Sequence, residues 1–183
     1  MALALRTPRL LLREWRDEDA GPFAAMSADS AVMELLLGPY DREKSDFWVA
    51  WARDYWRDNG YGMFVVELPG ETPFAGVVGL NRLTYEAHFT PAVEVAWRLA
   101  RPFWGRGIAH EAARAVIEDG FYRLGLPEIV AITVPANRRS WRLMERLGMV
   151  RDTGGDFDHP RVPAGHPLVR HVLYRLRRPE IGV

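Results

Sequence analysis

The sequence predicts a mixed α/β domain in which helices pack on a partly antiparallel sheet. Hydrophobic residues make up 48% of the 183 residues and charged residues 26%, a composition that supports a core of ordinary size. Hydrophobic patterns typical of strands and of helices succeed one another along the whole chain. We see no internal repeat, low-complexity tract or linker, so we expect a single domain over residues 1–183.

The first part of the chain is expected to form one strand and two short helices. Residues 8–15 (PRLLLREW) contain an apolar run bounded by a proline and by charges, as in a strand. Asp17 is expected to cap a helix over residues 17–26, with two further acids favouring the positive end of its dipole. Residues 30–37 predict a second helix, which a glycine and a proline end.

A stronger helical pattern covers residues 43–58, where aromatic side chains share one broad face. Two interpretations are open for the aromatic residues of this region: they belong to the core, which is the more common case, or they wall a substrate pocket. The residues are Trp48, Trp51, Tyr55, Trp56, Tyr61 and Phe64, with Phe47 also on the helix face.

Three strands are expected in the middle of the chain. Residues 61–68 (YGMFVVEL) and 74–80 (FAGVVGL) are rich in strand-forming residues, and the turn PGETP joins them as a hairpin. Residues 92–99 (AVEVAWRL) alternate as a third strand. A helix is expected over residues 107–124, ended by a glycine and a proline.

The last third of the chain continues the alternation. Residues 129–134 predict a strand, and residues 137–147 a helix that a glycine ends. Residues 149–153 begin another strand, a proline-rich loop (FDHPRVPAGHP) follows, and residues 168–176 form the last strand.

Composition and charge exclude several classes of function. Lysine plus arginine and aspartate plus glutamate both number 24, so no net charge attracts nucleic acid or a membrane surface. No cysteine is present, which excludes disulfides, a thiolate nucleophile and a thiolate zinc site. No apolar run approaches the ~20 residues that cross a bilayer, and the first residues make a poor signal peptide. We therefore expect a cytoplasmic protein without nucleic-acid or membrane partners.

The stretch WGRGIAHEA, residues 104–112, predicts an anion site. A strand leads into it and a helix leaves it, so N–H groups without partners and the positive end of the helix dipole meet there. Gly105 and Gly107 leave the backbone open, Arg106 adds a cation and Ala109 keeps the next turn narrow. The glycines could instead be ordinary loop residues. Neither a Rossmann fingerprint nor a Walker lysine is present, so a phosphate-bearing cofactor other than a dinucleotide or ATP is favoured.

Three segments resemble one family. The run VEVAWRLARPFWGRGIAHEAARAV resembles the cofactor segment of the GNAT superfamily of acetyl-CoA-dependent N-acetyltransferases, whose loop reads Q/R-x-x-G-x-G/A. Trp104 takes the first position of that loop, as is typical of the ribosomal-protein-alanine N-acetyltransferase-like branch. TPRLLLREWRDEDA and VPANRRSWRLMERLGM resemble further segments of the same branch, so the resemblance covers nearly the whole chain.

The resemblance implies a GNAT fold, with a mixed, mostly antiparallel sheet, splayed central strands and helices on both faces. It implies acetyl-CoA as cosubstrate, with pantetheine along the strand edge, pyrophosphate on the loop N–H groups and an asparagine across the gap. It also implies an amine acceptor, a small molecule or a protein N-terminus, and a possible homodimer. The cofactor residues carried over are Trp97, Arg98, Leu99, Gly105, Arg106, Gly107, Ile108, Ala109, His110 and Asn137.

Glu94 is the first candidate for the general base that amine acetylation requires. It alternates with apolar neighbours in a strand close to the expected pantetheine edge, and burial would raise its pKa. The alternative is a solvent-facing carboxylate or a structural partner of an arginine. His88 is a second candidate, and the late loop offers further acids and a base, namely Asp156, Asp158 and His159.

The family's usual tyrosine acid is absent, because Met144 occupies its place. Ser140, in the branch's N-x-x-S pattern, is the candidate that contacts or protonates the leaving thiolate, although it could simply support a cap formed by Asn137. Nearby arginines are more often solvated than bound to the cofactor's 3′-phosphate. Irregular spacing of the late histidines and aspartates argues against a metal site.

The sequence therefore predicts an acetyl-CoA-dependent N-acetyltransferase in which an amine attacks the thioester directly. Two alternatives stay open: a non-catalytic acyl-CoA-binding or regulatory module on the same fold, and a nucleotide-binding protein that uses the glycine loop.

Overall fold

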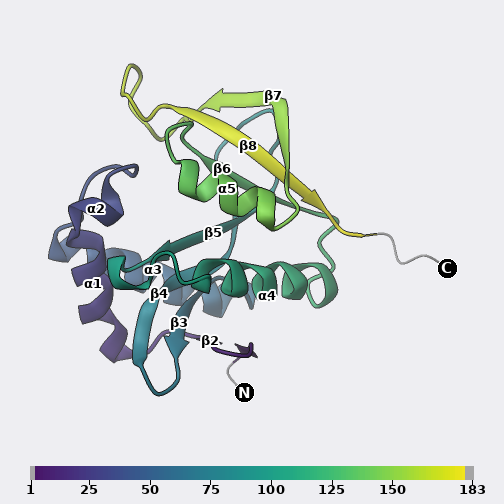
Figure 1. The fold of residues 1–183 in the computed structure, drawn as a ribbon. Coiled ribbons are helices and arrows are strands. Elements are labelled where there is room, and N and C mark those ends of the chain that lie inside the picture. Colours follow the sequence, from purple (N-terminus) through teal and green to yellow (C-terminus); the bar gives the residue numbers. More distant parts are fainter. Residues whose placement is uncertain (1–2, 180–183) are drawn as a thin grey trace.

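The computed structural model describes residues 3–179 and shows an eight-stranded sheet with helices on both faces (Figure 1). The strand order is β1-β2-β3-β4-β5-β6-β8-β7. The strands are β1 (Ala4–Arg6), β2 (Leu11–Arg13), β3 (Met63–Leu68), β4 (Thr72–Arg82), β5 (Val93–Leu99), β6 (Glu128–Thr133), β7 (Val150–Asp158) and β8 (Arg170–Arg177). The α-helices are α1 (Ala20–Ala28), α2 (Ser30–Met33), α3 (Arg42–Asn59), α4 (Ile108–Tyr122) and α5 (Arg138–Arg146).

The sheet opens between β5 and β6. These two strands are parallel and pair at one position only, Glu94 with Val130, whereas all other neighbouring strands are antiparallel. The opposite edge of β5 is paired with β4 along its length, from Val93 to Leu99. The backbone of β5 beyond Glu94 therefore has one edge without a ladder partner in residues 3–179. The predicted fold, a mostly antiparallel sheet with splayed central strands, is confirmed.

Helices cover the two faces of the sheet differently. The buried side chains of α4, such as Val116 and Phe121, pack on β4 and β5 on one face. Helix α5 lies on the same side, against β6 and β7, while α3 lies behind the sheet in the view of Figure 1. Residues 94, 96 and 98 of β5 point away from α4, because alternate residues of a strand face opposite sides.

The N-terminal segment differs from the prediction. The expected strand over residues 8–15 is present as the shorter β2, and an unpredicted strand, β1, precedes it. The N–H group of Thr7 donates to the carbonyl of Leu10 and turns the chain between the two strands. Asp17 does not cap α1, which follows a 3₁₀ turn, and its carboxylate instead pairs with exposed Arg53. Asp19 is the residue directly before α1, but its side chain caps no N–H group of that helix. Its carboxylate instead accepts the N–H group of Arg16, at the start of the 3₁₀ turn, at 2.7 Å.

Asp19 also forms a buried ion pair that ties α1 to the sheet. Its two oxygens accept both terminal nitrogens of Arg13, at 2.8 and 2.9 Å, and both residues are at most 5% exposed. We expect Asp19→Asn to lower the free energy of unfolding by about 3 kcal/mol, because the buried Arg13 guanidinium loses its bidentate carboxylate and keeps only Glu67, at 2.7 Å from its Nε atom. Urea denaturation measures this change.

Asp17→Asn is the matched control in the same turn, since its ion pair with Arg53 is exposed. Removal of an exposed pair changes the unfolding free energy by at most about 1 kcal/mol. Equal effects of the two variants would show that burial of the Arg13–Asp19 pair does not determine its contribution.

Candidate active site

The glycine loop lies where β5 ends and α4 begins. Gly105 and Gly107 adopt left-handed backbone angles, with φ of 75° and 77°, and Gly107 is the N-cap of α4. A Cβ at Gly105 would meet no heavy atom within 4 Å, so the loop is open on that side. The first N–H groups of α4, from Ile108 onward, have no acceptor within the helix and point toward this loop. The arrangement is suited to a phosphate-bearing ligand.

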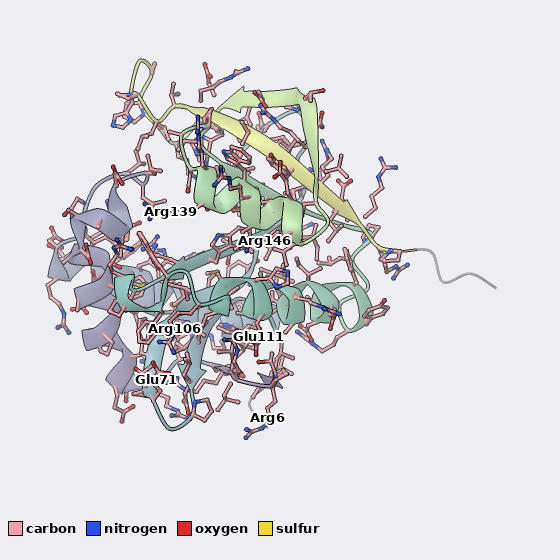
Figure 2. The ribbon with its side chains drawn as sticks, in the orientation of Figure 1. Arg6, Glu71, Arg106, Glu111, Arg139 and Arg146 are labelled. Carbon is pink, nitrogen blue, oxygen red and sulfur yellow. The ribbon has the colours of Figure 1, made fainter. Side chains whose placement is uncertain are left out.

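The side chain of Arg106 is already paired. Its guanidinium donates two hydrogen bonds to Glu71, at 2.6 and 2.8 Å, and the two residues lie together in Figure 2. These bonds lower the pKa of the Glu71 carboxyl. The loop cation expected from the sequence therefore links the loop to the turn between β3 and β4, and the Arg106 backbone remains for an anion.

Arg9 is a second cation at the loop, and the sequence analysis did not identify it. Its Nη1 donates to the Arg106 carbonyl at 3.0 Å, and its Nη2 lies 3.4 Å from the Cβ position of Gly107. Glu111, in the first turn of α4, holds Arg9 through the Nε atom at 2.7 Å and accepts the Thr7 hydroxyl at 2.6 Å. More than 95 residues separate these partners along the chain, and no local pattern connects them.

Ser140 and Asn137 face β5 from α5. The indole Nε1 of Trp97 donates to the Ser140 hydroxyl at 3.3 Å and so connects β5 with α5. Asn137 caps α5 by accepting the Ser140 N–H group, and its amide donates to Thr133 at 3.0 Å. Met144 is buried in the core, so this position of α5 presents no acid. The structure therefore brings Trp97, Ser140 and Asn137 together, and the cap predicted as the alternative is present.

His110 and Leu99 complete the predicted cofactor residues. The His110 ring lies 3.4 Å from the carbonyl of Arg146, at the other end of α5. The Leu99 side chain is buried in the core, and its carbonyl accepts the indole N–H group of Trp104 at 2.8 Å. Both contacts hold the loop and the end of β5 in place.

Glu94 lies at the point where β5 and β6 separate. Its side chain is half-buried, and burial raises the pKa of its carboxyl to about 8, although a hydrogen bond from the Ile132 backbone acts in the opposite direction. No arginine, lysine or histidine nitrogen in residues 3–179 lies within 4.0 Å of this carboxyl, so it is not the partner of an arginine. A carboxyl group with such a pKa can accept a proton from an ammonium group near neutral pH.

Tyr85 and His159 lie on the Glu94 side of the sheet. The charge of Glu94 and, more strongly, burial raise the pKa of the Tyr85 hydroxyl, which has no hydrogen-bond partner in residues 3–179. The His159 ring is 4.7 Å from the Tyr85 ring, and burial followed by the charges of His171 and Arg161 lowers the His159 pKa to about 4. His159 is therefore neutral at pH 7.

The other candidate carboxylates are already paired. Asp156 pairs with Arg151 at 2.7 Å, and Asp158 pairs with Arg170 at 3.2 Å. The His88 ring packs edge-on against Phe89, with their centroids 5.2 Å apart. Among the candidate carboxylates, Glu94 is thus the one without a charged partner in residues 3–179.

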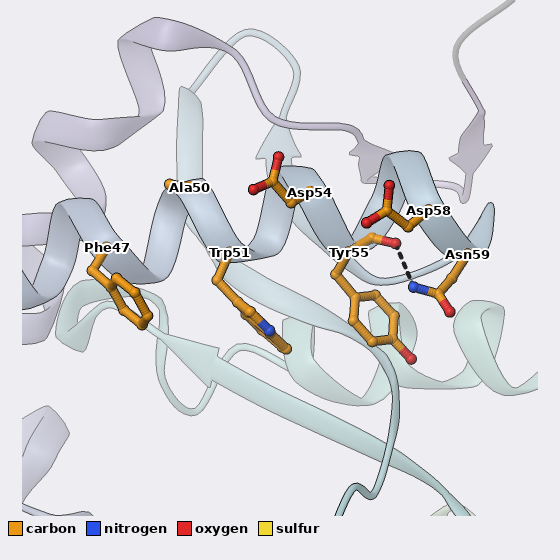
Figure 3. Close-up of a pocket in the computed structure, with 7 residues that line it drawn as sticks. All are labelled: Phe47, Ala50, Trp51, Asp54, Tyr55, Asp58 and Asn59. Atoms are coloured by element: carbon orange, nitrogen blue, oxygen red, sulfur yellow. Dashed lines mark hydrogen bonds between the residues drawn. The ribbon is translucent and has the colours of Figure 1, made fainter.

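The aromatic residues of α3 divide between the core and the surface. Trp56 and Phe64 are buried and meet edge-on at 4.7 Å, as expected for core residues. Phe47 and Trp51 are 73% and 38% exposed, contrary to the core interpretation. Their rings and that of Tyr55 line up along one side of α3 (Figure 3), beside a shallow pocket of about 290 Å³.

Two further properties of the described residues bear on the class of site. In residues 3–179, no group of three histidine, cysteine, aspartate or glutamate side chains is placed to hold a metal ion. Within the same range, the helices are too short or too polar to cross a membrane.

Comparison with known proteins identifies the family. Residues 9–150 match the family model described as an acetyltransferase (GNAT) domain. The chain belongs to the GNAT acetyltransferases. The uncharacterized N-acetyltransferase YnaD of Bacillus subtilis is 30% identical over 177 residues, which cover 96% of this chain and 98% of YnaD. The resemblance found in the sequence is confirmed, and the chain is an N-acetyltransferase.

Solved GNAT structures share the architecture. An acetyltransferase of Agrobacterium tumefaciens is 28% identical and superposes with a TM-score of 0.77, covering 96% of this chain and 95% of that chain. RimL, a ribosomal L7/L12 α-N-protein acetyltransferase solved in complex with coenzyme A, also gives a TM-score of 0.77, with 96% and 98% of the two chains covered. Its identity is 16%, so this likeness concerns the fold alone.

Proposed function

We propose that this GNAT enzyme transfers the acetyl group of acetyl-CoA to a primary amine that attacks the thioester directly. The observation that carries the proposal is the Glu94 carboxyl, which has a raised pKa and no charged partner in residues 3–179 at the opening of the sheet. Coenzyme A bound to RimL, a protein of the same fold, supports the cofactor class.

The proposed cofactor contacts follow from two open backbone segments. The N–H groups from Arg106 to His110, at the start of α4, bind the pyrophosphate. The free edge of β5 over residues 97–99 offers N–H and C=O groups in alternation, which match the amides of pantetheine. Asn137 lies on the far side of the gap and contacts the same arm. Bound there, acetyl-CoA supplies an activated carbonyl group and a thiolate leaving group.

The chemical steps assign one role to each side chain. The Glu94 carboxylate removes a proton from the acceptor ammonium, and the free amine attacks the carbonyl carbon. The tetrahedral intermediate collapses as the carbon–sulfur bond breaks and the thiolate leaves. Ser140 already accepts the Trp97 indole N–H, so its own hydroxyl proton can be donated to that thiolate. The amine nitrogen loses its second proton as the amide forms, and this proton restores the serine hydroxyl. No cysteine is present to form a covalent thioester with the enzyme.

The alternative function is a non-catalytic acyl-CoA-binding or regulatory module, which the methionine at the usual position of the tyrosine acid favours. Such a module would bind acetyl-CoA but would not need a carboxyl group with a raised pKa at the gap. Catalysis by the Glu94 carboxyl therefore separates the two functions.

Calorimetric titration with acetyl-CoA, with ATP and NAD as controls, tests the proposal, followed by assay of CoA release with a panel of amines. We expect the protein to bind acetyl-CoA but neither ATP nor NAD, and to release CoA at a rate that depends on the amine. Binding without turnover would support the non-catalytic module. Preference for ATP or NAD would refute the proposed cofactor.

Arg9 and Glu111 are expected to support cofactor binding from outside the loop. Glu111→Gln removes the charge that holds the Arg9 side chain, which in turn bonds the Arg106 carbonyl. Loss of one charge-assisted hydrogen bond corresponds to about 1.5 kcal/mol, so we expect the Kd for acetyl-CoA to rise about tenfold. Calorimetric titration with acetyl-CoA measures this Kd.

Glu118→Gln is the control for this prediction, because its pair with Arg114 is exposed and lies farther along α4. Its Kd should equal that of the wild type. Equal affinities of Glu111→Gln and the wild type would show that Arg9 does not shape the loop.

A further inference from the structure

Arg98 carries a charge without a close counterion in the described part of the chain. Its side chain is half-buried on the face of β5 that points away from α4, and no carboxylate in residues 3–179 lies within 4.0 Å of it. Other lysines and arginines in residues 3–179 also have no carboxylate within 4.0 Å, but all of them are exposed. A guanidinium withdrawn from water normally has a paired anion.

Aromatic rings surround the Arg98 guanidinium. Its carbon lies 5.4 Å from the Tyr40 ring centre and 5.9 Å from those of Phe23 and Trp48. These rings stabilise the cation through their faces but accept no in-plane hydrogen bonds. The side chain has five N–H donors, and one of them reaches the Ser27 hydroxyl, at 3.4 Å. The fork that usually holds a carboxylate or phosphate is thus largely unused.

A second cation adjoins the same ring. The Lys44 ammonium lies 4.3 Å from the centre of the Tyr40 ring. No carboxylate in residues 3–179 lies within 4.0 Å of this ammonium, and two acids near it in sequence are engaged: Asp41 accepts the Lys44 backbone N–H and Asp46 pairs with Arg42. Two positive charges without a close carboxylate therefore flank Tyr40, and their combined field attracts an anion.

Arg98 and Glu94 share one face of β5, four residues apart, which is about 13 Å along a strand. Helix α3 runs beside both residues. Near its start, the Trp48 ring adjoins Arg98. Farther along, the Tyr55 hydroxyl accepts the N–H group of Arg82, and Arg82 pairs with Val93, the neighbour of Glu94 on β5. Trp51 lies between these two positions on α3 and is 38% exposed. The rings of Trp48, Trp51 and Tyr55 follow one another along α3, with centroids 5.6 and 5.4 Å apart, and Figure 3 shows the last two. These rings therefore line the way from the side of Glu94 to Arg98.

We propose that Arg98, assisted by Lys44, binds an anionic group of the acceptor, a carboxylate or a phosphate. The acceptor is then a small amine with an apolar middle, whose amino group lies toward Glu94 and whose anion lies against Tyr40. The inference rests on the proposed acetyl transfer for the amine, and on the geometry of Arg98 for the anion.

Calorimetric titration of the CoA-saturated protein with hexanoate and with inorganic phosphate tests the anion site. Coenzyme A occupies the glycine loop in this assay, so the loop cannot bind the probe. We expect one of the two anions to bind, roughly tenfold more weakly to Arg98→Met, with Arg98→Lys in between. Binding of hexanoate identifies the anionic group of the acceptor as a carboxylate, and binding of inorganic phosphate identifies it as a phosphate. Binding of neither anion by the wild type, or equal binding by Arg98→Met, overturns the proposal.

Arg42→Met is the matched control, because it removes a neighbouring cation that is already paired with Asp46. It should bind the anion as the wild type does. Urea denaturation of each variant separates a loss of binding from a loss of folding. If the protein fails to bind coenzyme A, the proposed function is refuted, and the same titrations without coenzyme A still test Arg98.

Turnover gives an independent readout of the same site. The wild type is expected to favour 6-aminohexanoate over the uncharged 6-aminohexanamide by roughly tenfold in kcat/KM, mainly through KM. The ratio should approach one in Arg98→Met. A ratio that is unchanged in Arg98→Met would contradict binding of the carboxylate by Arg98, whatever the absolute rates.

Discussion

Replacement of Glu94 by glutamine is expected to lower kcat/KM by about 10³-fold while acetyl-CoA affinity stays unchanged. Glutamine preserves the shape and the contact with the Ile132 backbone but cannot accept a proton, and general bases contribute about 10²–10⁴-fold. Steady-state CoA release with a reactive amine measures the loss, and calorimetry measures the affinity. Ser140→Ala should reduce the rate less, because water or the Trp97 indole can still assist the leaving thiolate.

The pH dependence tests the same assignment. The base acts as a carboxylate, and its pKa is raised to about 8, so wild-type kcat/KM should rise as the pH increases toward 8 and level off above it. The pH profile of kcat/KM for Glu94→Gln should lack this rising limb. A limb that persists in the variant would assign the titration to another group and refute Glu94 as the base.

The stability of this variant should change in the opposite direction. The folded-state pKa of Glu94 lies above the unfolded value of about 4.3, so the folded protein holds an extra proton between these two pH values. The wild type therefore loses stability as the pH rises from about 4.3 to 8, by at most about 1.4 kcal/mol for each unit. Glu94→Gln removes this cost and should unfold at higher urea than the wild type at pH 8. A slower but more stable variant excludes general damage as the cause.

Segments with a strong local pattern were predicted to within a few residues. The alternation in AVEVAWRL places β5, and the two glycines before an amphipathic run place the start of α4, because both signals depend on neighbouring residues. The strand over residues 8–15 was predicted too long and β1 was missed, because a turn at Thr7 separates two short strands. The strand before the proline-rich loop was predicted too short, because β7 passes through two glycines and resumes pairing with β8 at Phe157.

Contacts between distant residues could not be read from the sequence. Arg9 meets Glu111 because the fold brings the turn before β2 to the first turn of α4, and neither residue has a distinctive local pattern. Arg106 is paired with Glu71 for the same reason, which changed its expected role. The identity of Glu94 as a candidate followed from alternation, whereas its lack of a charged partner in residues 3–179 required the three-dimensional arrangement.

A side chain at Gly107 is expected to weaken acetyl-CoA binding more than it weakens the fold. Gly107→Trp places a bulky group where the first N–H groups of α4 meet the ligand, and we expect the Kd to rise at least about 100-fold, equal to about 2.7 kcal/mol. Its φ of 77° adds a cost to any side chain, so a loss of binding must be separated from backbone strain.

Gly125 provides that separation, because it follows the opposite end of α4 with a similar φ of 70° and no heavy atom within 4 Å of its Cβ position. Gly107→Ala and Gly125→Ala should both lower the free energy of unfolding by about 1 kcal/mol. Only the Gly107 variant should also lose acetyl-CoA affinity, because only its backbone lies at the positive end of the helix dipole. Equal affinities of the two alanine variants would mean that the glycine loop is an ordinary turn and that the pyrophosphate binds elsewhere.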